Sequence, residues 1–481
     1  MKLASSILLC CTLLLGALQF ACSHTQAENS PPSNEKTAFF QARANDYLIK
    51  NEVLRPQLEI TENGVRMYAD VEARDSAKPE IKVLWEEAEV FVRMVKGLEV
   101  AEALEMYMGK GEQPFSAQAE QRIPPAVTTP AAATAGQPLK GWRIALDPGH
   151  VGGTMDFAFL EKKFVRIPKG DRPEVKEDIA FNEGNLALGT ALLLRDTLQK
   201  MGAEVLLTRE REGETAFGGK FADWLRGEYE SAAEDGTVDW TEFRGRSPEG
   251  YLIKHLRAAG WRYVMENDIH GADSTWWLSK PTTRDMYRIP FLKAEFKERA
   301  RKINAFRPHL TLIIHYNIWE KNTWDKGQTL HAIDDNYSMA FIPGSFMKGE
   351  LRKPEDRMAF LSKLLSDDLP ASERLSAAVV EGYEEHLKVP GMEWDDSLKY
   401  LRNASLRTPS KGVFARNLSL TRMVHGPMCF GEALYQDNVA ECVALNRKDF
   451  LLEGMRTYMP NRIRDAVDAY VAGVLKYAEG E

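Results

Sequence analysis

Hydrophobic residues in the second half of the chain alternate between short apolar runs and helical spacing. The runs at 143–146, 203–209 and 310–315 predict buried strands. Apolar residues three and four apart predict helices at about 182–201 and 295–306, each just ahead of one of the later strands. Strand, helix and strand at this spacing form a parallel βαβ unit. We therefore expect an α/β domain whose open sheet is mainly parallel, with helices on both faces.

The same pattern continues to the end of the chain. A strand is predicted near 339–342, a helix at about 372–387, a strand within 424–434 and a closing helix at 462–477. A long polar interval at about 210–291 is a large insertion in this pattern. The insertion contains five tryptophans and two histidines: Trp224, Trp240, Trp261, Trp276, Trp277, His255 and His270. Such aromatic side chains either stack on sugar rings or form the core of the insertion itself, and the sequence leaves both open.

The first 21 residues have the form of a secretory signal peptide. A basic residue precedes an apolar stretch at 7–21, and polar residues follow. Ala21-Cys22 resembles the processing site of bacterial lipoproteins, where Cys22 would carry the lipid. Gln19 stands where such signals favour Leu, so secretion with cleavage near Ala27 and an uncleaved anchor stay open. All three outcomes export the protein, and we expect it in the periplasm or cell envelope, anchored by lipid.

Three further segments precede the α/β domain. Residues 22–36 are polar and contain two prolines, which is typical of a tether. Residues 37–110 form a small, mostly helical unit, whose clearest element is a helix predicted over 79–108. Residues 111–141 are rich in Pro and Ala, cannot build a core and are expected to form an extended linker. The α/β domain, with its insertion, then spans 142–481.

Composition and charge exclude several classes of protein. Hydrophobic residues make up 44% of the chain and charged residues 27%, as in ordinary globular proteins. The formal net charge of −8 argues against a dedicated nucleic-acid binder, which is usually basic. Apart from the leader, no run reaches the ~18 apolar residues of a membrane span. Beyond Cys22 only Cys429 and Cys442 remain, and they fit a disulfide of an exported protein as well as two buried thiols.

Three polar residues fall where an open α/β sheet places its ligand site, beyond the carboxyl ends of the strands. His150 follows the first strand through a Pro-Gly turn, His315 ends the third strand, and Glu183 opens the first helix on the stripe that faces the sheet. A single His at a strand end is more often structural, but here two imidazoles and a carboxylate converge on one rim. That donor set, with an open fourth position, is common in catalytic zinc sites.

Glu432 is a fourth member of this group. It stands within an apolar strand, where an uncompensated carboxylate is costly to bury. A carboxylate beside a catalytic metal can take the proton of the attacking water, so Glu432 is the predicted base. Glu174, Glu177 and Asp178 compete with Glu183 for the metal. Glu183 is favoured because it alone keeps register with the buried face of its helix.

Several sequence motifs surround these residues. The first strand ends in Asp147-Pro148-Gly149-His150-Val151-Gly152-Gly153, and the second strand reads Gly202 to Arg209. The other matches are intervals between pairs of residues. They are Glu183 with Leu188, Arg299 with Asn304 and His315, Asn317 after His315, and Glu432 with Asn438. Together they resemble the zinc-dependent N-acetylmuramoyl-L-alanine amidases that cleave bacterial peptidoglycan, whose first motif is Asp-Pro-Gly-His-Gly-Gly. The resemblance covers about 142–209, 292–345 and 410–480.

The resemblance implies a reaction and a role for each residue. His150, Glu183 and His315 would hold Zn²⁺. Glu432 would be the catalytic base, and Asn317 would contact the substrate. The implied reaction is hydrolysis of the amide between N-acetylmuramic acid and L-alanine of the stem peptide by a zinc-activated water. The implied partner is peptidoglycan, a protein activator is left open, and no nucleic acid is expected.

The chain also departs from the family beside the site. The family's Ser-Ile-His reads Ile313-Ile314-His315, the Asp before that strand reads His309, and Glu-x-Gly-Phe reads Glu432-Ala433-Leu434-Tyr435. None of these changes removes a predicted ligand or the base, so activity is expected. Two alternatives stay open: a zinc hydrolase of another cell-wall peptide amide, and a catalytically silent cell-wall-binding lipoprotein. A serine hydrolase is disfavoured because no Gly-x-Ser-x-Gly elbow occurs.

Overall fold

The computed structural model describes residues 33–111, 113–130, 136–224, 227, 284, 287–326 and 328–480. The predicted signal peptide and Cys22 lie outside these residues, as does most of the insertion. Among the tryptophans and histidines of the insertion, those outside the described residues are Trp240, Trp261, Trp276, Trp277, His255 and His270. Among the described helices, none is long and apolar enough to cross a membrane.

A seven-stranded sheet forms the centre of the larger part of the molecule. Its strands are β4 (Arg143–Pro148), β7 (Glu204–Leu207), β8 (Leu310–Asn317), β9 (Met339–Ile342), β10 (Ser405–Arg407), β11 (Val413–Arg416) and β12 (Met428–Tyr435). They lie in the order β10-β11-β9-β12-β8-β4-β7. The half from β12 to β7 is parallel throughout, whereas β9 pairs antiparallel with β12 and β10 antiparallel with β11. The predicted mainly parallel sheet is confirmed.

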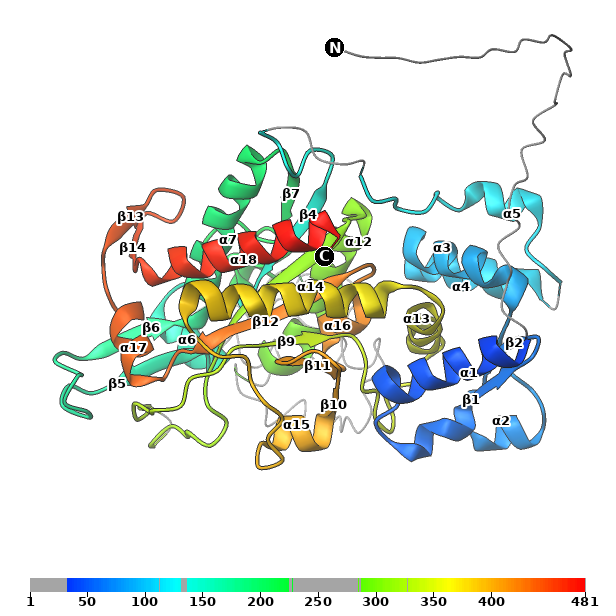
Figure 1. Ribbon diagram of the computed structural model, residues 1–481, viewed down its shortest axis with the longest axis horizontal. Coiled ribbons are helices and arrows are strands. Elements are labelled where there is room, and N and C mark those ends of the chain that lie inside the picture. The colour runs from blue at the N-terminus through cyan, green and yellow to red at the C-terminus, as the bar shows by residue number, and fades with distance from the viewer. Residues whose placement is uncertain are drawn as a thin grey trace, which may run out of the picture.

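Helices cover both faces of this sheet. The main ones are α7 (Glu183–Lys200), α12 (Leu292–Phe306), α14 (Asp368–Gly382), α16 (Ser419–Met423) and α18 (Arg462–Glu479). Leu312 and Ile314 of β8 point into the core beneath α7, α14 and α18, whereas Ile313 points to the opposite core beneath α12 and α16. In Figure 1, α14 and α18 run side by side across the first of these faces. The predicted α/β fold with helices on both faces is confirmed.

The capping residues explain where the first helix of this domain begins and ends. The side chain of Asn182 accepts a hydrogen bond from the backbone N–H of Asn185 at 2.8 Å, which is a standard N-cap. Gly202 follows the helix with a φ of 98°, a conformation that favours glycine.

The helix predicted at 372–387 instead begins at Asp368 and continues beyond Gly382 as a π-helical turn.

Smaller elements surround the sheet, and they were not predicted, except that the turn at Tyr383–Leu387 forms the end of the helix predicted at 372–387. They are α6 (Met155–Glu161), the hairpin β5 (Phe164–Ile167) and β6 (Ile179–Asn182), α13 (Pro354–Leu365), α15 (Lys399–Ala404), α17 (Val439–Leu445), the hairpin β13 (Phe450–Leu452) and β14 (Thr457–Met459), and π-helical turns at Tyr287–Phe291 and Tyr383–Leu387. Cys429 and Cys442 are free and buried, so the choice left open by the sequence is resolved in favour of two thiols.

The N-terminal unit is a small sheet covered by helices. Its elements are α1 (Ser33–Arg43), β1 (Leu58–Thr61), β2 (Gly64–Met67), α2 (Val71–Asp75), β3 (Ile81–Leu84), α3 (Ala88–Gly97), α4 (Val100–Lys110) and α5 (Ala117–Arg122), with short 3-10 or π-helical turns at Ala44–Leu48, Glu52–Gln57 and Trp85–Glu87. The strands form an antiparallel sheet in the order β1-β2-β3. The predicted tether therefore ends earlier than residue 36, because α1 begins at Ser33.

The single helix predicted over 79–108 is wrong. Its first part is β3, in which Ile81 and Val83 are buried while Lys82 between them is exposed. This run is too short to distinguish the two-residue period of a strand from helical spacing. The rest is divided into α3 and α4 after Gly97. A Cβ on Gly97 would lie 2.9 Å from Cδ of Pro124, so this glycine lets the following linker pack against the helix.

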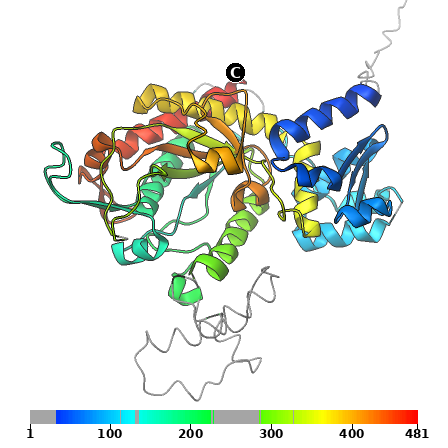
Figure 2. The same ribbon diagram turned by 90° about the horizontal axis from the view of Figure 1, so that it is seen from below.

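The N-terminal unit and the sheet domain share a hydrophobic core. Leu48, Phe91 and Met94 of the unit lie in one buried cluster with Phe346 and Phe360 of the sheet domain. Figure 2 shows α13 between the two parts, next to the N-terminal helices. The boundary predicted at residue 142 therefore marks a change in the sequence pattern, but it does not separate two independent hydrophobic cores.

The linker at 111–141 is attached to the surface at several points. His309 is hydrogen bonded through Nε2 to the carbonyl of Thr128 at 3.0 Å, and Arg307 donates to the carbonyl of Pro125. Ile123 and Leu139 are buried. The described residues of the linker, 113–130 and 136–141, therefore pack along both parts, and α5 shows that they are not extended throughout as the sequence predicted.

Phe360→Ala tests the shared core. Phe360 is fully buried and packs edge-to-face on Phe346 at 5.1 Å, so truncation is expected to cost about 3–5 kcal/mol in the free energy of unfolding, measured by urea denaturation. The control Phe39→Ala removes a ring that is 53% exposed and should cost under about 0.5 kcal/mol. Equal effects of the two substitutions would contradict a shared core.

Candidate functional site

The loop after β4 carries His150 to the carboxyl edge of the sheet. His150 has a φ of 59°, in the left-handed region, which turns the chain sharply after Gly149. A Cβ on Gly149 would lie 2.4 Å from Cε1 of His315, so only glycine lets the loop pass this close to β8. The Pro-Gly turn thus brings the two histidines together.

Glu183 is the first residue of α7, and its side chain is only 1% exposed. The N-terminus of a helix favours a negative charge. Oε1 accepts a hydrogen bond from the backbone N–H of Tyr316 at 3.3 Å, and Oε2 accepts one from Nε2 of Gln436 at 3.3 Å. Glu183 is therefore held in one orientation by neighbours from β8 and from the end of β12.

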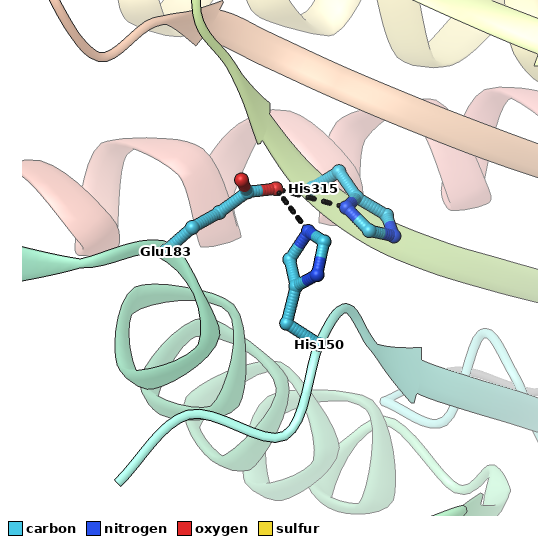
Figure 3. Close-up of side chains that lie close together, drawn as sticks. All are labelled: His150, Glu183 and His315. Carbon is cyan, nitrogen blue, oxygen red and sulfur yellow. Dashed lines mark hydrogen bonds and ion pairs between the residues drawn. The ribbon is translucent and has the colours of Figure 1, made fainter. Parts of the chain in front are cut away.

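The two imidazoles meet on one oxygen of Glu183 (Figure 3). Oε1 lies 3.0 Å from Nε2 of His150 and 2.9 Å from Nδ1 of His315. The rings are 4.7 Å apart and nearly perpendicular, at 89°. One nitrogen of each imidazole and one carboxylate oxygen all lie within 4.8 Å of one another. The structure thus brings together the three predicted metal ligands, and this arrangement could hold a metal ion.

The protonation states of His150 and Glu183 suit a cation. Burial lowers the pKa of His150 to about 3, which leaves its imidazole neutral at pH 7. Burial pushes the pKa of Glu183 upward, but interactions with His150 and Lys163 outweigh it and hold this pKa well below its usual value. Nζ of Lys163 lies 3.6 Å from Oε2 of Glu183. Neutral imidazole and ionised carboxylate are the forms that bind metal ions.

Glu432 lies beside this cluster on the neighbouring strand. In the parallel register of β12 and β8, Glu432 pairs with His315, and Phe430 stacks on the His315 ring at 4.3 Å. Oε2 of Glu432 is buried and has no hydrogen-bond partner among the described residues. Burial, with the charge of Glu183, raises the pKa of Glu432 to about 7. An unpartnered carboxylate with this pKa is suited to exchanging a proton near neutral pH.

The other predicted residues lie as follows. Asn317 is two residues beyond His315 on β8, and its Oδ1 accepts a hydrogen bond from the backbone N–H of Ile318 at 2.9 Å. The role of Asn317 in substrate binding stays a prediction. The three competing acids, Glu174, Glu177 and Asp178, are exposed in the loop between β5 and β6 and do not belong to the metal cluster.

Arg299 has a role that its sequence spacing did not indicate. It is 1% exposed on α12, and its guanidinium donates to the carbonyl of His150 at 2.8 Å and to that of Pro148 at 2.9 Å. The same group pairs with two fully buried acids, Asp147 and Glu295. Arg299 therefore fixes the His150 loop from the face opposite α7.

Glu161 holds the same loop from another side, and the sequence analysis missed it. Its carboxylate accepts hydrogen bonds from the backbone N–H groups of Val151 and Gly152, both at 3.0 Å, and from the hydroxyl of Tyr287. The one signal in the sequence is an acid at the end of a short amphipathic segment, which is too common to single out a functional residue.

Comparisons with known proteins gave matches among solved structures. Neither a family model nor a curated protein matches the chain. The CwlD amidase from Clostridioides difficile in complex with the GerS lipoprotein is 15% identical over 71% of this chain and 100% of its own, with a TM-score of 0.33. The N-acetylmuramyl-L-alanine amidase Ami1 from Mycobacterium smegmatis is 12% identical over 71% and 99%, with a TM-score of 0.34.

A third neighbour is the catalytic domain of CwlV, an N-acetylmuramoyl-L-alanine amidase from Bacillus (Paenibacillus) polymyxa var. colistinus. It is 11% identical over 71% of this chain and 99% of its own, with a TM-score of 0.31. These neighbours are amidases, as is the family that the sequence motifs resemble. Because identity and TM-scores are this low, the activity proposed below rests on the side chains of this chain.

Arg299→Met tests the support of the His150 loop. The substitution leaves the buried carboxylates of Asp147 and Glu295 without their cation, so it is expected to cost about 3–5 kcal/mol in the free energy of unfolding. Arg301→Met on the same helix is the matched control, because Arg301 is half exposed and pairs with Glu298 at the surface. Equal losses of stability in urea denaturation would contradict the role given to Arg299.

Proposed function

We propose that this protein is a zinc-dependent amidase that hydrolyses the bond between N-acetylmuramic acid and L-alanine in peptidoglycan. The main support is the meeting of His150, Glu183 and His315 at the carboxyl edge of the sheet. Glu432 lies beside them, and its buried Oε2 has no hydrogen-bond partner among the described residues. The sequence motifs supply the choice of bond.

The donor set fits a zinc ion. Two imidazole nitrogens and one carboxylate oxygen are the ligands of many catalytic zinc sites, which leave the fourth position open. Nε2 of His150 is buried and makes no well-directed hydrogen bond within the described structure, so it is available as a ligand. When bound, Zn²⁺ polarises the substrate carbonyl and makes a water acidic enough to attack near pH 7.

Glu432 performs the proton transfers in this proposal. Its carboxylate takes the proton of the attacking water and then delivers it to the departing amine of L-alanine, so that the peptide leaves as a neutral amine. A base that also acts as an acid works best with a pKa near the working pH, as burial gives Glu432 here. The positive charges of Lys163 and Arg416 favour its ionised form.

Peptidoglycan is the proposed partner, and the two alternatives predict other outcomes. A zinc hydrolase of another cell-wall peptide amide would release different fragments, which mass analysis of digested muropeptides distinguishes. A silent cell-wall-binding lipoprotein would purify without stoichiometric zinc. Export and lipidation of Cys22 stay predictions from the sequence, and whether a protein activator takes part stays open.

Glu432→Gln tests the base. The amide keeps the size of the side chain but cannot accept a proton, so release of stem peptides from purified sacculi should fall at least about 100-fold. Zinc content should stay at the wild-type level because the three ligands are intact. Peptide release at the wild-type rate would refute the assignment.

His315→Ala tests the metal site. The wild-type protein is expected to bind about one Zn²⁺ per chain in calorimetry after removal of metal by a chelator, and the variant should bind at least about tenfold more weakly. His386→Ala is the matched control, because His386 is exposed and lies outside the cluster. Equal zinc affinities in the two variants would exclude His315 as a ligand.

A further inference from the structure

A pocket opens at the same edge of the sheet as the metal cluster, on the far side of β12 from β4. It has a volume of about 250 Å³ and is lined by segments after β8, before β9 and before α15, together with the end of β12. The lining includes Trp319, Lys321, Tyr337, Trp394, Leu398 and Tyr435. None of them belongs to the metal cluster, and no role has been given to this pocket so far.

The pocket adjoins the proposed catalytic base. Tyr435 lies three residues after Glu432 on β12, which is roughly 10 Å along a strand at ~3.3 Å per residue. Tyr337 precedes β9 by two residues, and Met339 at the start of β9 pairs with Glu432. Tyr435 and Leu398 share a hydrophobic cluster with Phe430, the ring that stacks on His315. A ligand in the pocket would therefore lie within roughly 10 Å of the proposed base along β12.

The walls of the pocket are aromatic and held in place. Nε1 of Trp394 donates to Asp396 at 2.8 Å, and the guanidinium of Arg407 lies 4.8 Å from its ring centre. Nζ of Lys321 lies 5.4 Å from the centre of the Trp319 ring. Both indoles are half buried, so part of each remains accessible. Rings fixed in this way lose little side-chain entropy when a ligand stacks on them.

Two contacts tie the opposite walls together. Nζ of Lys321 donates to Oγ of Ser397 at 2.7 Å, and Glu320 accepts the backbone N–H of Lys399 at 2.5 Å. The loop after β8 and the loop before α15 are thus connected across the pocket. The pocket is therefore formed before any ligand arrives, as is usual for small-molecule sites.

The chemistry of the lining favours a neutral, hydroxyl-rich ligand. Flat aromatic walls match the apolar C–H faces of a sugar ring. The buried side chains of Met392 and Leu398 provide an apolar surface for a small group such as an acetamido methyl. Three carboxylates in the lining, on Asp335, Glu393 and Asp395, can accept hydrogen bonds from hydroxyl or amide groups. The same carboxylates would repel the acidic stem peptide.

We propose that this pocket binds one N-acetylated sugar of the glycan strand whose stem peptide is cut beside Glu432. The proposal rests on the proposed function, since it places the glycan on the β12 side of the scissile amide. Trp319 and Trp394 hold the sugar ring, and the carboxylates orient its hydroxyl groups. The enzyme would then recognise the glycan strand as well as the peptide that it removes.

Calorimetry of the full-length protein with a tetramer of N-acetylglucosamine tests the pocket without requiring catalysis. Trp394→Ala and Trp319→Ala are each expected to weaken binding roughly tenfold or more, because each removes a stacking surface. Trp394→Phe keeps a ring and should retain most of the binding. Trp85→Ala, which removes a half-buried tryptophan of the N-terminal unit, is the matched control and should bind like the wild type.

Each outcome decides the matter. Loss of binding in both alanine variants, with normal binding in Trp85→Ala, supports the proposal. No binding by the wild type, unchanged binding in both pocket variants, or displacement of the tetramer by stem peptide free of sugar overturns it. If the tetramer binds through the pocket but no peptide is released from sacculi, the hydrolytic function fails while the sugar site stands. If peptide release is normal and the pocket variants bind the tetramer as tightly as the wild type, only the sugar site is refuted.

Discussion

The burial of one carboxylate governs the arrangement of the site. Glu183 is 1% exposed, and an ionised group placed so deep costs several kcal/mol unless neighbours compensate it. Compensation comes from the N-terminus of its own helix, the backbone of Tyr316, Gln436, Lys163 and two imidazoles. These groups come from segments far apart in the chain, so they meet only when the parallel strands and α7 are assembled. The fold and the cluster thus form together.

Elements that continue the alternation of strands and helices in the larger part were predictable, including the four-residue strand β9. The strands β4 and β8 and the helices α7, α12 and α18 follow from apolar runs and helical spacing. The small sheet of the N-terminal unit was not predictable, because β3 lies outside this alternation and a four-residue run by itself fits either period. The shared core with α13 could not be predicted for a related reason. An apolar stripe indicates that one face of a helix is buried, but it does not indicate which element packs against that face.

The residues of the site also divide into those that the sequence predicts and those that it does not. His150, Glu183, His315 and Glu432 could be found because strand ends of an open sheet define one rim, and because their spacing resembles a known family. The residues that hold this rim in place could not. Arg299 and Glu161 act by hydrogen bonding to the backbone around His150, and no pattern of side chains in the sequence reports a contact to a distant carbonyl or N–H group.

The core that joins the N-terminal unit to α13 also couples the motions of the two parts. Because the two parts pack as one body, the unit does not add length as a swinging arm would. Turning the unit away from α13 would expose fully buried rings such as Phe346 and Phe360 to water, so its orientation relative to the sheet is fixed by the same packing that keeps both parts folded.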